Sequence, residues 1–433
     1  MIDLKLLREN PEIFKKACTQ KRIKLDIDEI IKLDKQVREL KQQIEKIRAE
    51  KKIASDKIAK LQGDEKNKAI KETKILSDKE KELSPQLESL EPELKTKLLF
   101  LPMPASPETP EGKDDSENKE LYTWGKLPKF DFEPLDHMSI AEKCDLIDMP
   151  RGAKIAGSRS YFLKNEGMRL EMAIMMYALD KLTKKGFTPF IVPTLVNYEA
   201  MMGTSYFPGG EEQAYTVGVQ KEKGGAIESD NKYLTGTAEV ALTSYHYDEI
   251  LEEDTLPKLY CGFSTCYRRE AGTYGKDTQG VYRIHQFQKI EQVIICKNDA
   301  EESKKMHELI LKNSEEVLQD LNLPYRVVAV CTGDMGRGQY YKNDIETWMP
   351  SRKSYGETHS CSTFHDFQSR RLNLRYRNSE GKINFCHTLN NTCVASPRIL
   401  IPILEIYQQK DGSVKIPKVL IPYMNGQKTI DPR

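Results

Sequence analysis

The chain has 433 residues, enough for one large domain and a smaller one. Its 67 Lys and Arg nearly balance 66 Asp and Glu, so any RNA contact must rest on local basic patches. No stretch approaches the roughly 18 apolar residues of a membrane span, and the N-terminus lacks a signal-peptide pattern, so we expect a cytoplasmic protein without a membrane partner. Nine scattered cysteines without a CxxC pair predict reduced, buried thiols and no structural zinc.

The first hundred residues have the pattern of a coiled coil. Ten positions, all but one apolar, recur at alternating steps of three and four: Ile30, Leu33, Val37, Leu40, Ile44, Ile47, Lys51, Ala54, Ile58 and Leu61. Residues 62–64 (QGD) predict a reversal, and a less regular series follows through Ala69, Leu76, Leu83, Leu87, Leu90 and Leu94. This seam predicts an antiparallel helical hairpin over about residues 30–98, with arms of roughly 45 Å.

Two prolines bear on the shape of the return helix. Pro85 and Pro92 lack a backbone N–H and crowd the preceding turn, and they lie off the Leu83–Leu94 seam. We therefore expect the second helix to be bent or interrupted.

The charge of the outgoing helix bears on its partner. Between Asp34 and Gln62, nine Lys or Arg residues against five Asp or Glu leave a net charge of +4. This excess fits a solvated coiled-coil face, and it also fits a rail that contacts RNA phosphates without reading bases. The hairpin residues alone leave both interpretations open.

The composition changes after the hairpin. Residues 106–125 are rich in Pro, Ser, Glu, Asp and Gly, which is typical of a linker between domains over 1–105 and 126–433. In the second domain, short apolar runs predict strands near 190–193, 258–260, 288–295 and 326–330, and residues 301–321 predict an amphipathic helix. Their irregular order favours an α+β fold with an antiparallel sheet. No P-loop or Rossmann motif follows a strand.

The densest polar cluster lies over residues 263–272 and 283–291, which read as a strand, a mobile Gly-rich loop and a return strand. The guanidinium of Arg268 can grip a phosphate or a carboxylate, and Phe287 can stack on a base. Glu270 and Glu291 can accept hydrogen bonds from an amino group or a hydroxyl. By itself the cluster fits a ligand site and a salt-bridged hairpin about equally well.

The cluster carries a family resemblance. Residues 267–272 (YRREAG) and 283–287 (RIHQF) resemble motif 2 of class II aminoacyl-tRNA synthetases, in the form found in seryl-tRNA synthetases. Four more segments are similar to signatures of that family in the same order: 186–193 to motif 1, 235–239 to the serine-pocket loop, 357–362 to the metal and ATP strand, and 391–405 to motif 3. The family also has an N-terminal helical hairpin that holds tRNA. The resemblance therefore covers essentially the whole chain.

The resemblance implies an ATP site and a class II antiparallel sheet flanked by helices. Arg268, Glu270 and Arg398 would be catalytic: Arg268 would bridge the α-phosphate and the serine carboxylate, Glu270 would read adenine, and Arg398 would hold the γ-phosphate. The implied ATP-binding set is Arg268, Arg269, Glu270, Ile284, His285, Gln286, Phe287, Glu357, Thr358, His359, Ser360 and Arg398. Glu357 and Ser360 would hold Mg²⁺ with the ATP, and no tightly bound organic cofactor is expected.

The resemblance also implies a serine pocket. Its residues would be Thr237, Ala238, Glu239, Arg268, Glu291, Asn390 and Thr392. Glu291 and Thr392 would lie nearest the serine hydroxyl. Groups arranged to bond a hydroxyl are left unpaired by alanine, which would explain rejection of that amino acid.

The expected activity is activation of L-serine with ATP and transfer of the seryl group to tRNA(Ser) held by the hairpin, in a homodimer. Selenocysteine tRNA stays open as a second acceptor. One alternative is a synthetase-fold paralogue that ligates an amino acid to a non-tRNA acceptor, but such paralogues typically lack the arm. Another is a catalytically silent binding module, but the chain keeps Arg268, Glu270, Glu291 and Arg398.

Overall fold

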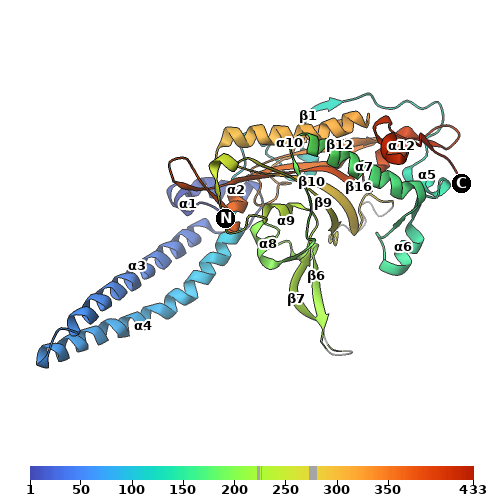
Figure 1. Cartoon of the computed structure of the whole chain (residues 1–433). Coiled ribbons are helices and arrows are strands. Elements are labelled where there is room, and N and C mark those ends of the chain that lie inside the picture. Colours follow the sequence, from blue (N-terminus) through green and yellow to red (C-terminus); the bar gives the residue numbers. More distant parts are fainter. Residues whose placement is uncertain (222–224, 226, 273–279) are drawn as a thin grey trace. The chain divides into compact units, whose positions relative to one another are not determined.

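A computed structural model of the chain describes residues 1–221, 225, 227–272 and 280–433 (Figure 1). The chain divides into two compact units, Met1–Pro104 and Ala105–Arg433. Most of the loop predicted between the two strands of the polar cluster lies outside the described residues. No helix in the described ranges is long and apolar enough to cross a membrane.

The first unit consists of helices, two of which, α1 and α3, are capped at their starts by a carboxylate. They are α1 Leu4–Glu9, α2 Pro11–Gln20, α3 Ile27–Ile58 and α4 Gly63–Phe100. The Asp26 carboxylate accepts a hydrogen bond from the Glu29 amide at 3.0 Å, which satisfies an N–H that has no partner within α3. The chain then reverses before Gly63, whose φ of +63° favours glycine, so the predicted turn is confirmed.

The helices α3 and α4 pack along the predicted seam. Ile30, Leu33, Val37, Ile44 and Ile47 are buried, and the remaining predicted seam positions on both helices are at least partly buried. Ion pairs join the two helices in antiparallel register, at Lys97–Glu29 (3.0 Å), Lys41–Glu91 (2.5 Å) and Arg48–Glu80 (2.7 Å). The antiparallel coiled-coil hairpin is therefore confirmed, with burial that decreases from its base toward its tip.

Of the two expectations for the return helix, a bend or an interruption at the prolines, the interruption is wrong. One unbroken helix, α4, contains both Pro85 and Pro92. Both side chains are exposed, as the off-seam position predicted. The carbonyls that lose a partner four residues earlier therefore face water, which can hydrogen-bond them.

The second unit is built on an eight-stranded sheet with the order β1-β11-β12-β13-β16-β10-β9-β4 (Figure 1). All neighbouring pairs are antiparallel except β4 and β9. This arrangement confirms the antiparallel α+β prediction. The strands are β1 Lys119–Trp124, β4 Thr188–Ile191, β9 Lys258–Tyr267, β10 Gln286–Cys296, β11 Tyr325–Ala329, β12 Tyr341–Met349, β13 Ser354–His365 and β16 His387–Ser396.

One part of the predicted linker is a strand. β1, within residues 106–125, pairs with β11 at the edge of the sheet. Its side chains are largely exposed, so it lacks the apolar alternation that marks a strand in the sequence, and backbone pairing to β11 holds it. Smaller sheets complete the unit: β2 Ile147–Asp148 with β3 Phe162–Leu163; β5 Leu195–Asn197, β7 Ile227–Leu234 and β6 Tyr215–Gln220; β8 Ile250–Glu252, β14 Arg375–Arg377 and β15 Ile383–Phe385; and β17 Val414–Lys415 with β18 Thr429–Ile430.

Helices cover the sheet, and side chains alternate between its two faces. Along β10, Ile294 and Cys296 join the core under α10 (Ala300–Asp320) and α7 (Asn165–Lys184), whereas Val293 and Ile295 join a separate core with α9 (Glu239–Thr243). The predicted helix over 301–321 is thus confirmed as α10. The remaining helices are α5 His137–Lys143, α6 Met149–Ala156, α8 Tyr198–Gly203, α11 Phe367–Leu372 and α12 Leu400–Tyr407.

The cysteines follow the prediction for buried thiols. All nine are buried and carry no disulfide. Burial raises the pKa of Cys261 and of Cys296 to about 12 each, so these thiols stay protonated at neutral pH.

Candidate active site

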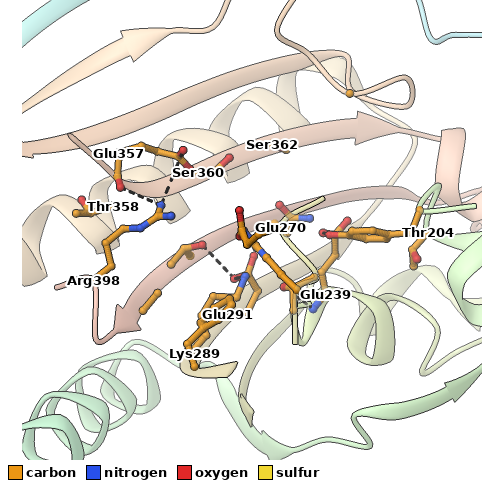
Figure 2. Close-up of a pocket in the computed structure, with 18 of the residues that line it drawn as sticks. Thr204, Glu239, Glu270, Lys289, Glu291, Glu357, Thr358, Ser360, Ser362 and Arg398 are labelled. Carbon is orange, nitrogen blue, oxygen red and sulfur yellow. Dashed lines mark hydrogen bonds and ion pairs between the residues drawn. The ribbon is translucent and has the colours of Figure 1, made fainter. Parts of the chain in front are cut away.

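A cleft on the face of the sheet opposite α10 collects most of the predicted site residues. It holds about 1100 Å³ of empty space, part of it open to solvent. Its walls come mainly from β10, β13 and β16, from the segment after β9 and from the loop before α9 (Figure 2). Thirteen predicted residues line it: Thr237, Glu239, Arg268, Glu270, Ile284, Phe287, Glu291, Glu357, Thr358, Ser360, Asn390, Thr392 and Arg398.

Five predicted residues lie outside the lining: Ala238, Arg269, His285, Gln286 and His359. The sequence resemblance selected continuous runs, but a strand presents only every second side chain to one face. His359 is an example, because it is buried and donates its Nε2–H to the Cys393 carbonyl oxygen at 3.0 Å. Burial lowers the pKa of His359 to about 4, so the ring is neutral. Its role in ATP binding stays a prediction.

The other four residues also lie outside the cleft lining, and each makes contacts elsewhere. Ala238 is fully buried in the core beside Leu242. His285 turns its Nδ1 to the Arg268 carbonyl oxygen at 2.9 Å, and Gln286 lines a second, neighbouring cavity. Arg269 donates its backbone N–H to the Gln213 carbonyl oxygen and is not among the residues that line the cleft.

Arg268 follows directly after β9 and lines the cleft. Its guanidinium lies near the Gly236 carbonyl oxygen, with Nη2 at 3.3 Å, and 5.2 Å from the centre of the Phe287 ring. The side chain is exposed to the cleft and is therefore available to an anionic ligand. It stands between an aromatic surface on one side and the loop of Thr237 and Glu239 on the other.

Glu270 lines one wall of the cleft, and Arg283 pairs with it. Glu270 has a φ of +50°, in the left-handed region that favours glycine, and its carboxylate accepts a hydrogen bond from Arg283 Nη1 at 3.1 Å. The ion pair holds the carboxylate at the cleft, where it can accept a hydrogen bond from a ligand amino group.

Arg398 and Glu357 form the opposite wall, as Figure 2 shows. Arg398 donates to the Glu357 backbone oxygen at 3.0 Å, lies 3.9 Å from its carboxylate, and packs 4.3 Å from the centre of the Tyr282 ring. Burial raises the pKa of Glu357, but the positive charges of Arg398 and Lys342 outweigh that effect and hold the pKa below its usual value. The Glu357 side chain is therefore a carboxylate at neutral pH.

Glu357 and Ser360 form the predicted cation site. Ser360 lies opposite Asp344 on β12, and one Asp344 oxygen is buried without a hydrogen-bond partner. Mg²⁺ commonly takes one or two protein oxygens and completes its shell with substrate phosphates and water. Among the described residues no group of three or more His, Cys, Asp or Glu side chains could hold a metal. The donor set thus fits a cation that binds together with a nucleotide.

A buried ion pair forms the floor of the cleft. Lys289 and Glu291, both on β10, lie 2.5 Å apart with side chains 5% and 3% exposed. Thr392 of β16 donates its hydroxyl to Glu291 at 3.3 Å. Two polar groups from neighbouring strands therefore meet at one point, where a small polar ligand could bond both.

Glu239 is the second buried carboxylate of the cleft. Tyr206 donates its hydroxyl to one oxygen at 2.9 Å, and Gln368 donates its amide to the other at 2.8 Å. Burial and the negative charge of Glu291 raise the pKa of Glu239 to about 7, despite these two donors and the nearby Lys289. The site therefore holds a carboxyl group that a bound cation would ionise fully.

Sequence reasoning missed several lining residues. Tyr206, Lys289 and the 336–339 segment were given no role, although Gln339 reaches Ser362 at 2.8 Å. The run at 333–338 (GDMGRG) follows a predicted strand and has the composition of a loop. This signal could have pointed to the 336–339 segment. Tyr206 lies far from the motifs in the chain and has no comparable signal.

Comparisons with known proteins bear on this geometry. Residues 1–104 match the model of the seryl-tRNA synthetase N-terminal domain, and residues 220–407 match that of the tRNA synthetase class II core domain (G, H, P, S and T). The chain is 44% identical to the serine–tRNA ligase of Deinococcus radiodurans, with 99% of each chain covered, and 45% identical to that of Dictyoglomus turgidum, with 100% of each covered.

Two solved structures that resemble this chain are also seryl-tRNA synthetases. The seryl-tRNA synthetase from Pyrococcus horikoshii complexed with ATP superposes with a TM-score of 0.90 at 37% identity, covering 100% of both chains. The cytoplasmic serine–tRNA ligase from Naegleria fowleri in complex with AMP gives a TM-score of 0.86 at 32% identity, covering 100% of this chain and 99% of that one.

The largely antiparallel sheet, with Arg268 and Arg398 both lining its cleft, defines the core of a class II aminoacyl-tRNA synthetase. The match of the N-terminal unit and the full-length relatives identify one family within this class. The chain belongs to the seryl-tRNA synthetase family.

Proposed function

We infer that the chain is a serine–tRNA ligase, which makes seryl-adenylate and pyrophosphate from L-serine and ATP and then transfers the seryl group to tRNA(Ser). The observation that carries this function is the arrangement of Arg268 between Phe287 and the two buried carboxylates, Glu239 and Glu291. A nucleotide and a small polar amino acid can occupy the two sides of one guanidinium.

The first step needs no enzymic nucleophile. The serine carboxylate oxygen attacks the α-phosphorus of ATP, the bond from that phosphorus to the bridging oxygen breaks, and pyrophosphate leaves. Arg268 would contact both reacting groups and neutralise the charge that grows on the phosphate. Catalysis then consists mostly of orientation and charge neutralisation.

Other residues would fix the nucleotide. Phe287 would stack on adenine, Glu270 would accept from its amino group, and Arg398 would hold the γ-phosphate. Glu357 and Ser360 would hold Mg²⁺, which neutralises phosphate charge when bound.

The serine pocket would lie between Glu239 and Glu291. Glu291 and Thr392 meet at 3.3 Å and would bond the serine hydroxyl, while Glu239 would bind the ammonium group. Alanine would leave Glu291 and Thr392 without that partner, which penalises it. In the second step, a ribose hydroxyl of the tRNA attacks the acyl carbonyl, and AMP leaves.

The pKa of Glu239 leads to a pH prediction. Its carboxyl titrates near pH 7, and only the ionised form pairs with the serine ammonium. Serine affinity is therefore expected to fall up to about tenfold for each pH unit below 7 and to level off above it. The groups facing Glu239 are Glu291 and Lys289 from β10 and Tyr206 from the loop after α8.

Calorimetry with L-serine in two buffers of different ionisation enthalpy measures both affinity and protons released. Near pH 6.5 binding should release a fraction of a proton, and Glu239→Gln should abolish the release. Serine affinity that stays constant from pH 6 to 8 would contradict this assignment.

The arm would supply the tRNA contact. Its outgoing helix carries a net charge of +4 between Asp34 and Gln62, and its outer half has little buried surface of its own. This reach supports the rail interpretation over a solvated coiled-coil face. We also propose that the enzyme is cytoplasmic.

ATP–pyrophosphate exchange with each of the twenty amino acids, without tRNA, tests the function. Exchange with serine alone is expected. A matched variant replaces residues 49–79 by a short turn, because Arg48 and Glu80 face each other across the hairpin. This variant should keep exchange and lose tRNA charging; loss of both activities, or of neither, would contradict the assigned division of labour.

A homodimer is proposed on the basis of an exposed apolar face. Ile191, in the motif 1 segment at the sheet edge, is 88% exposed, and Met168, Met172 and Met176 lie on one exposed stripe of α7. Light scattering of the intact chain measures its mass, and a monomer at micromolar concentration would overturn the dimer.

A further inference from the structure

Gln368 of α11 lies behind the cleft and touches two of its walls. The side chain is buried at 1% exposure and is not part of the cleft lining. Its amide nitrogen donates to the Glu239 carboxylate at 2.8 Å and to the Thr204 backbone oxygen at 3.1 Å. One buried amide thus joins the loop of residues 204–206 to the start of α9.

The orientation of this amide is forced by its partners. A carboxylate oxygen and a backbone carbonyl oxygen can only accept, so the NH₂ group must face Glu239 and Thr204. The amide oxygen on the other side accepts from the Thr388 hydroxyl at 2.7 Å. Thr388 is fully buried at the start region of β16. The three hydrogen bonds leave Gln368 a single arrangement.

The same contacts fix the orientation of the Glu239 carboxyl group and favour its ionised form. With Gln368 on one oxygen and Tyr206 on the other, both oxygens hold a donor and the carboxylate plane is fixed toward the cleft. Donors to the charged form oppose the raising effects of burial and of the Glu291 charge. Without them Glu239 would be neutral over a wider pH range and free to rotate.

We propose that Gln368 is a positioning residue for amino-acid recognition, which acts through Glu239 by holding its carboxylate in one orientation, aimed at the substrate ammonium. The proposal rests on the proposed function, since it needs serine in this pocket. Thr388 serves the same purpose one step further away, because it fixes the amide that fixes Glu239. Gln368 touches no substrate and is not a catalytic residue.

The test is Gln368→Met, which keeps the length of the side chain and removes both donors. In ATP–pyrophosphate exchange, KM for serine is expected to rise about 10- to 100-fold, the range of one hydrogen bond to a charged group. KM for ATP should stay near the wild-type value. The acidic limb of kcat/KM for serine should move upward by about one pH unit, because removal of a donor raises the pKa of Glu239.

Gln292→Met is the matched control. Gln292 is an equally buried glutamine on β10, but its amide donates to the Ile310 backbone oxygen and to Ser314 under α10, on the other face of the sheet. Its loss should lower stability without moving KM for serine or the acidic limb. If Gln292→Met moves both as Gln368→Met does, the effect is general loosening and the proposal is overturned.

Thr388→Val provides a milder second variant in case Gln368→Met does not fold. A rise in KM for serine and an upward shift of the acidic limb, both smaller than for Gln368→Met, support the proposal. If the wild type shows serine-dependent exchange but the folded variants keep its serine KM and pH profile, the role of Gln368 is overturned. The proposed function would still stand in that case. A wild type without that exchange overturns the proposed function and this inference with it.

Discussion

Replacing Arg268 by alanine is expected to reduce serine-dependent ATP–pyrophosphate exchange by about 10²- to 10³-fold, with little effect on stability. The guanidinium is exposed to the cleft and makes only weak contacts with the Gly236 carbonyl oxygen, so the fold does not depend on it. Its loss removes the one group that would contact both reacting anions. The fall should appear mainly in kcat, because that charge grows in the transition state.

Arg269 offers a matched control one residue away. Its side chain is equally exposed but lies outside the cleft lining, so Arg269→Ala should leave exchange close to wild type. This pair of variants also tests the assignment of Arg269 to ATP binding. Arg268→Lys should recover only part of the activity, since an ammonium lacks the planar fork that can bond two groups at once. Equal losses in Arg268→Ala and Arg269→Ala would contradict the central role of Arg268.

The second large effect is expected for Glu291→Gln. This change removes the negative charge 2.5 Å from Lys289 and leaves a buried ammonium without its ion-pair partner. The free energy of unfolding should fall by about 3–5 kcal/mol, the usual effect of breaking a buried ion pair. Serine-dependent exchange should fall roughly 100-fold as well, because the hydroxyl loses its charged acceptor.

A double variant separates these two effects. Lys289→Met with Glu291→Gln removes both charges, so denaturation should show most of the lost stability restored. Exchange should stay low, since neither substitution returns the acceptor. Recovery of exchange along with stability would mean that Glu291 serves the fold and not the amino acid.

The large features of the fold could be predicted because they repeat along the chain. The apolar seam from Ile30 to Ile47 has the period of a coiled coil, and burial follows it. The strand that contains Glu291 could be read from its apolar run in the same way. Where period and packing agree, local sequence is sufficient to place an element.

Other features depend on tertiary contacts that the sequence does not display. Pro85 and Pro92 stay within α4 because their side of the helix faces solvent, which is a property of the pair of helices. β1 is held by pairing with β11, and its exposed side chains carry no strand pattern.

The site likewise contains residues that the sequence could indicate and residues that only the folded chain brings together. The resemblance located Glu239 and Glu291, but the residues that hold Glu239 come from distant segments. Tyr206 lies 33 residues before it and Gln368 lies 129 residues after it. Only the folded chain brings them together, and no spacing rule links them. His359 shows the reverse case, because it lies within a matching run but is buried, bonds the Cys393 carbonyl oxygen and lies outside the cleft lining.

Side chains alternate between the two faces of the sheet along β10, β13 and β16. This alternation tolerates changes of residue type more readily than it tolerates an inserted or deleted residue. One inserted or deleted residue in β13 would turn the segment beyond it over, so that Ser360 would point to the core and Cys361 to the nucleotide. The arm has no such limit, since insertion of matched seven-residue units in α3 and α4 would preserve its seam and only lengthen it. Among relatives, insertions should therefore accumulate in the hairpin and in loops, while the spacing from Glu357 to Ser360 stays invariant.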